Sequence, residues 1–133
     1  MPAGGSVLRP DPARRFASRV FRGAAIYGVL VLLPLYFVQV PDPYRLIQLG
    51  FAGVALAFQG VFWVIGGRPL AYRPLMPMAV LEKLSFGVPV LVFFTLGRAE
   101  TLLAVFGAID LLLGALFLWA MLRLGRESAF RTR

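Results

Sequence analysis

The chain alternates between long apolar stretches and short polar connections. Apolar runs of about 20 residues cover positions 20–40, 46–66, 74–96 and 101–122. A helix that rises about 1.5 Å per residue needs roughly 20 residues to cross a ~30 Å hydrocarbon core. Because backbone groups find no water inside a bilayer, each run is predicted to be helical. The pattern predicts an all-α integral membrane protein with four spans.

The connections between these runs are short and rich in proline and glycine. Pro41 and Pro43 separate the first two spans, Gly66 and Gly67 end the second, and residues 97–100 join the last two. Short connections make neighbouring helices antiparallel, which predicts a four-helix up-down-up-down bundle.

The ends of the chain differ in character from the spans. Residues 1–10 are predicted to form a disordered N-terminus, and residues 125–133 a basic cytoplasmic tail. Asp11 and Pro12 are typical of a helix start, so the membrane domain is expected to cover 11–124. Pro34 is expected to kink the first span.

Basic residues are distributed unevenly between the two sides of the predicted bundle. Eleven arginines lie at the two termini and in the connection after the second span, whereas Arg45 and Arg98 alone lie on the opposite side. The positive-inside rule then places both termini in the cytoplasm. Thirteen arginines to one lysine suggest a GC-rich bacterial genome, so the membrane is expected to be a bacterial inner (plasma) membrane. With a net charge of +8, contact with anionic lipid headgroups is expected rather than nucleic-acid binding. The arginines expected at the headgroups are Arg14, Arg15, Arg19, Arg22, Arg123 and Arg126.

Composition narrows the chemistry that the chain can perform. Hydrophobic residues make up 59% and charged residues 15%, and the sequence contains neither cysteine nor histidine. Disulfides, zinc sites built from Cys or His, and catalysis by thiolate or imidazole are therefore excluded. No catalytic residue, metal or cofactor is expected, and the protein is predicted not to be an enzyme.

Ionisable residues inside the spans are the candidates for function, because each costs about 2.5–3.5 kcal/mol at the centre of a bilayer. They are Glu82, Lys83 and Asp110. Lys83 lies ten residues beyond Arg73 and Asp110 ten residues beyond Glu100, so both are roughly 15 Å deep. Two adjacent antiparallel helices would then place opposite charges at one level, which predicts a Lys83–Asp110 ion pair.

This polar cluster has a surplus of negative charge, which favours further partners. Gln59 and Tyr27 are the candidates on the second and first spans. The cluster is interpreted first as a device that fixes helix register, as buried polar groups do in membrane bundles. A pathway for a proton, cation or small substrate, and a quinone or lipid site, are the alternatives.

Small residues recur at helical spacing and predict close helix packing. Those that flank the charges on the third and fourth spans are Ala79, Gly87, Gly107 and Gly114. A second set lies on the second span at Gly50, Gly53, Ala57 and Gly60. This set is expected to pack within the chain, the alternative being contact between copies in a homo-oligomer or with another subunit of a membrane complex.

The segment from Tyr72 to Lys83, YRPLMPMAVLEK, resembles one in uncharacterised small bacterial inner-membrane proteins with four helices. The resemblance covers about residues 45–122 and implies the same topology without an activity. In size and helix count the chain is similar to the DoxX-like group, some members of which are associated with respiratory or redox complexes. Small multidrug transporters are similar in outline, but they carry a glutamate in the first span, where this chain has none.

Together these patterns predict a multi-pass membrane protein that is a structural or accessory component. A small proton- or cation-coupled carrier that uses Glu82 or Asp110 is the first alternative. A quinone- or redox-linked membrane component is the second.

Overall fold

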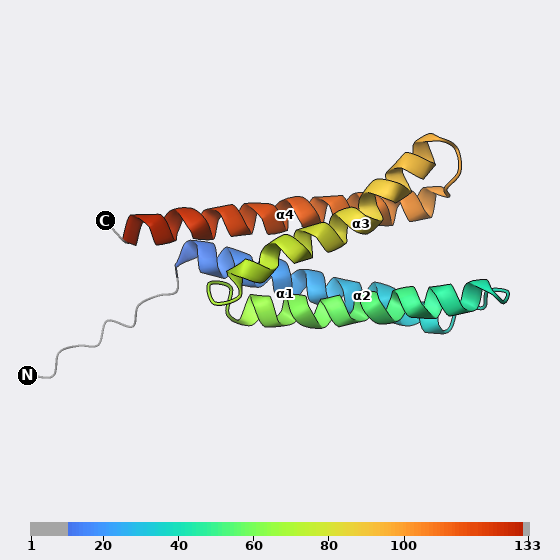
Figure 1. Ribbon diagram of the computed structural model, residues 1–133, viewed down its shortest axis with the longest axis horizontal. Helices are drawn as coiled ribbons and strands as arrows, with labels where there is room; N and C mark the ends of the chain where they lie inside the picture. The colour runs from blue at the N-terminus through green and yellow to red at the C-terminus, as the bar shows by residue number, and fades with distance from the viewer. Residues whose placement is uncertain (1–10, 132–133) are drawn as a thin grey trace, which may run out of the picture.

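The computed structural model describes residues 11–131, and most of this part is helical (Figure 1). The elements are α1 (Pro12–Leu32), η1 (Leu33–Tyr36), α2 (Tyr44–Gly67), η2 (Arg73–Leu75), α3 (Met76–Thr95) and α4 (Thr101–Arg131). Within residues 11–131, all four α-helices are long and apolar enough to span a membrane. The prediction of an all-helical chain with four such helices is confirmed.

The first helix begins and ends earlier than the predicted span. α1 starts at Pro12, directly after Asp11 as predicted, and it ends at Leu32 rather than near residue 40. The chain continues as the 3-10 turn η1, which contains Pro34. Proline lacks the N–H that an α-helix needs, so the expected kink takes the form of this tighter turn. The predicted disordered segment 1–10 lies outside the described residues.

The last helix is longer than the predicted span. α4 continues to Arg131, although the apolar run ends near Leu122. The additional residues include arginine, glutamate and alanine, which favour helices, and no proline. The part of the expected basic tail that the structure describes is therefore a continuation of α4.

The helices pack as two helical hairpins, α1 with α2 and α3 with α4. Each hairpin has an extensive internal interface, α1 also packs against α4, and α2 has little contact with α3. Figure 1 shows the hairpins close together near the start of α1 and the end of α4, whereas the turn between α3 and α4 stands away from α1 and α2. The two hairpins therefore converge at one end, which we call the closed end, and diverge toward the other.

Aromatic side chains fill the closed end. The rings of Phe21 and Phe117 stack with centroids 4.1 Å apart, and Phe62 meets Phe117 edge-on at 5.0 Å. These side chains come from α1, α4 and α2, and Met76 at the start of α3 is also fully buried. Aromatic pairs contribute about 0.5–1.5 kcal/mol beyond burial, so this core holds the two hairpins together.

Glycines bring α3 and α4 into close contact, as the sequence predicts. A Cβ on Gly87 would lie 2.9 Å from the carbonyl oxygen of Gly107. A Cβ on Gly107 would lie 2.8 Å from a methyl of Val90, and one on Gly114 would lie 3.2 Å from the Cβ of Lys83. Larger side chains at these glycines would force the two backbones apart. Ala79, in the same series, is buried as well.

The small residues of α2 do not pack within the chain as expected. A Cβ on Gly50 or Gly60 would meet nothing within 4 Å, and a Cβ on Gly53 would meet only the hydroxyl of Tyr36, at 3.5 Å. Ala57 is exposed. The prediction of within-chain packing is therefore wrong for Gly50, Ala57 and Gly60. The physical reason is that α2 buries a different face, which carries Ala52, Ala55, Gln59 and Phe62.

Candidate ligand-binding chamber

Lys83 is the most deeply placed charge in the described part of the molecule. It follows Ala79 by one turn on the buried face of α3 and is 4% exposed. Its Nζ donates a hydrogen bond to Asp110 Oδ1 of α4 over 3.2 Å, and the pair forms a salt bridge. The predicted Lys83–Asp110 pair is therefore present. Gly114, one turn beyond Asp110, leaves the space that the lysine stem occupies.

Glu82 joins the same ammonium group from the neighbouring position on α3. Its Oε2 lies 3.3 Å from Lys83 Nζ, which makes an ion pair. This oxygen is buried, and the ammonium group of Lys83 is its charged partner. The side chains of Glu82 and Asp110 remain 16% and 14% exposed, compared with 5% for Lys83. The lysine is thus enclosed, and the two carboxylates lie at the edge of an opening.

Gln59 faces this cluster from α2 but does not bond to it. The residue is 2% exposed, and its Nε2 donates to the carbonyl oxygen of Ala55, one turn back, over 2.9 Å. Its Oε1 is buried without a hydrogen-bond partner. The amide contacts Gly28 of α1 so closely that any side chain there would overlap it. Gly28 is thus part of the site, which the sequence did not indicate.

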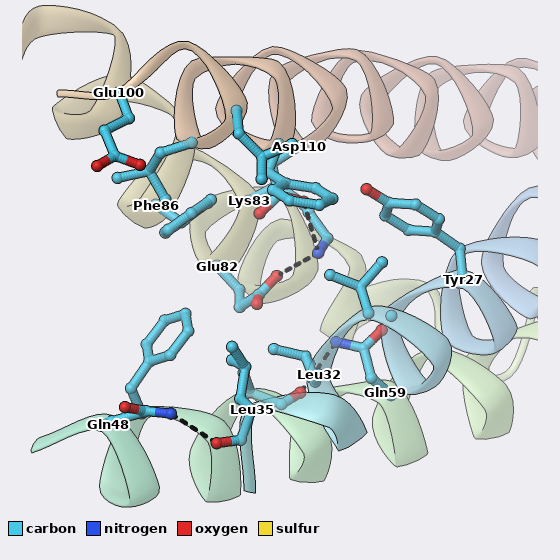
Figure 2. A pocket seen from close by; sticks show the side chains of 17 residues that line it. Tyr27, Leu32, Leu35, Gln48, Gln59, Glu82, Lys83, Phe86, Glu100 and Asp110 are labelled. Atoms are coloured by element: carbon cyan, nitrogen blue, oxygen red, sulfur yellow. Dashed lines mark hydrogen bonds and ion pairs between the residues drawn. The ribbon is translucent and has the colours of Figure 1, made fainter. Parts of the chain in front are cut away.

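Tyr27 approaches from α1. Figure 2 shows its hydroxyl directed toward Asp110 and Lys83, with Gln59 below it and Glu82 opposite. Among the residues that the structure describes, no hydrogen bond joins Tyr27 to the cluster. The five residues singled out by the sequence therefore lie around one space, although only Glu82, Lys83 and Asp110 contact one another.

That space is a cavity of about 460 Å³ between the two hairpins, which we call the chamber. It is lined by Tyr27, Gly28, Val31, Leu32, Leu35, Gln48, Phe51, Ala55, Gln59, Glu82, Lys83, Phe86, Glu100, Leu102, Leu103, Phe106 and Asp110. These residues come from the end of α1 and η1, the first two thirds of α2, the middle of α3, and the start of α4 with the residue before it. The chamber therefore occupies the open part of the molecule, beyond the aromatic core.

Two polar residues of the chamber were missed at the sequence level. Gln48 donates from Nε2 to the carbonyl oxygen of Leu35 over 2.5 Å, which ties α2 to η1. Gln48 and Gln59 are eleven residues apart, which is close to three helical turns, so both lie on the same face of α2. This spacing could have identified Gln48 as a second polar residue of the site. Glu100 precedes α4, and Figure 2 shows its carboxylate directed toward Phe86 and the chamber. Because Glu100 lies in a connection between two spans, helical spacing did not indicate that it lines the chamber.

The charges around the chamber do not balance. Among the described residues that line it, the part-buried carboxylates of Glu82 and Asp110 share the one ammonium of Lys83, and Glu100 adds a carboxylate at an exposed position. Lys83 Nζ also lies 5.2 Å from the centre of the Phe62 ring, a further favourable contact for the cation. Excess negative charge is costly where water is scarce. The chamber can therefore be stabilised by a proton or by a cationic ligand.

The donor set does not favour metal chelation. Within residues 11–131, no group of three or more His, Cys, Asp or Glu side chains is close enough to hold a metal ion. The remaining lining is mainly leucine and phenylalanine. An apolar cavity with a few convergent polar groups is typical of a small-molecule site.

Comparison of the chain with protein-family models, with curated proteins and with solved structures finds no match. The interpretation of the chamber thus rests on its own residues, and the likeness to DoxX-like proteins is one of size and helix count.

Proposed function

We propose that this protein is a four-span carrier of a bacterial inner membrane, in which the chamber exchanges protons for a small cation. In this proposal it is not an enzyme, and both termini are cytoplasmic. Glu82 and Asp110 are the exchanging groups. The buried ammonium group of Lys83 holds both carboxylates in place.

Surface composition supports the placement in a membrane. Large apolar side chains point outward from every span, for example Leu30 at 68% exposure, Leu46 at 80% and Leu112 at 61%. Such surfaces are costly in water and favourable in lipid. The aromatic end of the molecule carries most of the arginines, so the positive-inside rule puts this closed end in the cytoplasm. The chamber then opens toward the outer side.

The arrangement of two arginines supports headgroup contact at the closed end. The guanidinium groups of Arg22 and Arg123 lie 5.0 Å and 5.1 Å from the ring centres of Trp63 and Phe16. Arginine over an aromatic ring is held in position while its outer edge stays available to phosphate. In the proposal these residues, with Arg14, Arg15, Arg19 and Arg126, contact anionic lipid headgroups.

The observation that carries the functional proposal is that the buried charges border an open chamber. An ion pair that only fixes helix register needs Lys83 and Asp110. It does not need Glu82, whose carboxylate is a second anion on the same ammonium group. It also joins α3 to α4, which are already one hairpin, and leaves the facing hairpin unbound. Binding of an exchangeable cation accounts for the carboxylate that exceeds the single ammonium group.

The exchange balances in charge. A protonated carboxyl group of Glu82 or Asp110 releases its proton to solvent, and the carboxylate that remains pairs with the incoming cation. The buried cluster of Glu82, Lys83 and Asp110 carries no net charge in either state, whereas Glu100 is exposed. Because either occupant neutralises the same group, transport of the cation would be coupled to counter-movement of a proton.

Proton release from purified protein in weakly buffered detergent tests this proposal. Sodium, potassium, ammonium, tetramethylammonium and tetraphenylphosphonium salts are added separately, and an indicator dye reports the pH. We expect at least one cation to release protons from the wild type and less from Glu82→Gln or Asp110→Asn. Asp42→Asn, in the exposed connection before α2, is the matched control and should release as much as the wild type.

Two results would contradict proton exchange. One is an absence of release with every cation of this series. The other is release from the Glu82→Gln/Asp110→Asn double variant that equals release from Asp42→Asn.

A further inference from the structure

We propose that a phospholipid with two phosphate groups on one headgroup, of the cardiolipin class, binds between α1 and α2 at the closed end of the molecule. The site consists of a basic recess, which takes the phosphates, and an apolar groove beside it, which takes an acyl chain. This inference rests on the proposed membrane placement and headgroup contact, and it is independent of proton exchange in the chamber.

The basic recess lies where the start of α1 meets the connection after α2 (Figure 1). It has a volume of about 620 Å³, and among the described residues that line it none is acidic. A Cβ on Gly66 would lie 3.2 Å from the backbone nitrogen of Arg22 and 3.2 Å from the carbonyl oxygen of Ser18, so the two helices are in close contact at this place. The polar side chains and glycines of the lining are Arg14, Arg15, Ser18, Gly66, Gly67 and Arg68.

Three arginines in or beside the recess have no acidic partner. Among residues 11–131, no carboxylate forms an ion pair with Arg14, Arg22 or Arg68. Arg22 belongs to this group because a Cβ on Gly67 would lie 3.5 Å from one of its terminal nitrogens. A guanidinium group binds phosphate oxygens through two parallel hydrogen bonds. A headgroup with one phosphodiester supplies one negative charge, whereas a headgroup with two supplies both from a single bound molecule and compensates more of these arginines.

An apolar groove continues from the recess along the same face of the hairpin. It is a hollow of about 380 Å³ between α1 and α2, and its lining includes Ala25, Ile26, Val29, Leu30, Gly60 and Trp63. Arg22 and Val29 are seven residues apart on α1, which is close to two helical turns, and Gly67 and Gly60 have the same spacing on α2. At the junction, the guanidinium group of Arg22 lies 5.0 Å from the ring centre of Trp63. The recess and the groove therefore follow one another along the hairpin.

This order of basic recess, tryptophan and apolar groove favours a lipid over a soluble phosphate. A soluble phosphate would use the recess alone. Gly60 lies roughly 10 Å further into the membrane than Gly67 at about 1.5 Å per residue, and Ile26 and Leu30 leave the groove open to lipid. Tryptophan is typical of the level of the headgroups, and basic pockets between helices on the cytoplasmic side suit lipid headgroups that carry several phosphate charges.

Quenching of tryptophan fluorescence tests both the ligand and its position. The chain has two tryptophans, so Trp119→Phe leaves Trp63 as the only reporter. This variant, purified in detergent, is titrated with cardiolipin or with phosphatidylglycerol, both with brominated acyl chains that quench a neighbouring indole. At equal phosphate the two lipids supply equal numbers of brominated chains. We expect saturable quenching of Trp63 at an amount of cardiolipin at least about tenfold lower than of phosphatidylglycerol. Trp63→Phe, which leaves Trp119 on α4 as the reporter, should show no such difference.

Two changes in the Trp119→Phe protein test the recess and the groove separately. Arg14→Gln/Arg68→Gln should raise the amount of cardiolipin needed for quenching about tenfold or more. Its matched control, Arg45→Gln/Arg98→Gln, removes the same charge at the opposite end of the molecule and should have no effect.

The groove is tested by Gly60→Leu, which occupies it without a change of charge and should also weaken quenching. A Cβ on Gly60 would meet nothing within 4 Å, so the larger residue does not disturb the packing of the helices. Thermal unfolding shows whether each variant is folded. If one of the two changes prevents folding, the other decides the result.

Several outcomes would overturn the inference. Equal quenching by the two lipids at equal phosphate, or quenching that neither change weakens, would leave only unspecific headgroup contact. Inorganic pyrophosphate distinguishes the lipid from a soluble phosphate: a tenfold excess over the lipid should leave quenching unchanged, and displacement of the lipid would contradict the proposal. The Glu82→Gln/Asp110→Asn double variant should bind cardiolipin as its parent does, so a failure of proton exchange and a failure of lipid binding are seen separately.

Discussion

At the scale of single residues, the packing of Gln59 against Gly28 defines the inner wall of the chamber. Gln59 bonds only to the carbonyl oxygen of Ala55 of its own helix, and its amide lies directly over Gly28 of α1. A Cβ at position 28 would occupy the space of the amide, so a larger residue there would force Gln59 to move. The contact holds the carbonyl oxygen of Gln59 against α1, because Oε1 is the atom nearest to a Cβ built on Gly28.

Replacement of this glycine tests the contact. Gly28→Ala should destabilise the protein by about 1–3 kcal/mol, the usual range for an overpacked buried position. Thermal unfolding in detergent measures the effect. Gly23→Ala on the same helix is the matched control, because a Cβ there meets nothing within 4 Å, and it should leave the unfolding temperature unchanged or raise it. The additional change Gln59→Ala should restore most of the loss. If Gly28→Ala and Gly23→Ala had the same unfolding temperature, the contact between Gln59 and Gly28 would not affect stability.

At the scale of helices, the hairpin of α3 and α4 combines a close backbone contact with a buried ion pair. The same interface contains Gly87 and Gly107, which bring the backbones together, and the ion pair between Lys83 and Asp110. Close approach and a buried pair reinforce each other, because a shorter separation excludes water from the charges. The depth of the pair could be predicted, since the helical rise fixes how far each residue lies from the start of its span.

Replacement of Lys83 alone should lower the free energy of unfolding more than replacement of Lys83 and Asp110 together. Lys83→Met leaves Glu82 and Asp110 side by side without their cation, and a loss of about 3–5 kcal/mol is expected for a broken buried pair. Asp110→Asn should cost less, because Glu82 still accompanies the lysine. The double variant Lys83→Met/Asp110→Leu should be more stable than Lys83→Met alone. Unfolding temperatures in one detergent provide the comparison, and additive losses would show that the pair is not coupled.

The packing of α2 shows where prediction from sequence fails. Gly50, Ala57 and Gly60 form a regular small-residue series, yet α2 packs on α1 through Ala52, Ala55 and Phe62. Spacing identifies a face of a helix but does not tell whether that face meets a helix of the same chain, lipid or a second copy. For the same reason Gln59 could be named as a partner of the cluster, but its contact with Gly28 could not.

At the scale of the whole molecule, the division into two hairpins creates the chamber. Aromatic residues close one end, and the limited contact between α2 and α3 leaves a chamber toward the other. The number of helices and the level of the charges follow from the hydrophobic pattern. The opening between the hairpins does not, because it depends on side-chain volumes that accumulate over all four helices. Glu100 enters the chamber only as a consequence of that opening.

Labelling of single cysteines tests most directly whether the charged cluster borders an open chamber. The native chain has no cysteine, so Leu103→Cys in the lining and Leu112→Cys on the outward surface of α4 can each be the sole reactive thiol. Membrane-impermeant thiol reagents, one cationic and one anionic, are applied to membrane vesicles of both orientations.

The account predicts that Leu103→Cys reacts from the outer side, faster with the cationic reagent than with the anionic one. The preference should decrease when Glu82→Gln or Glu100→Gln is added, and Leu112→Cys should react slowly with both reagents. Equal slow reaction of the two cysteines, or no preference for the cationic reagent at Leu103→Cys, would contradict the claim that an acidic chamber lies between the hairpins.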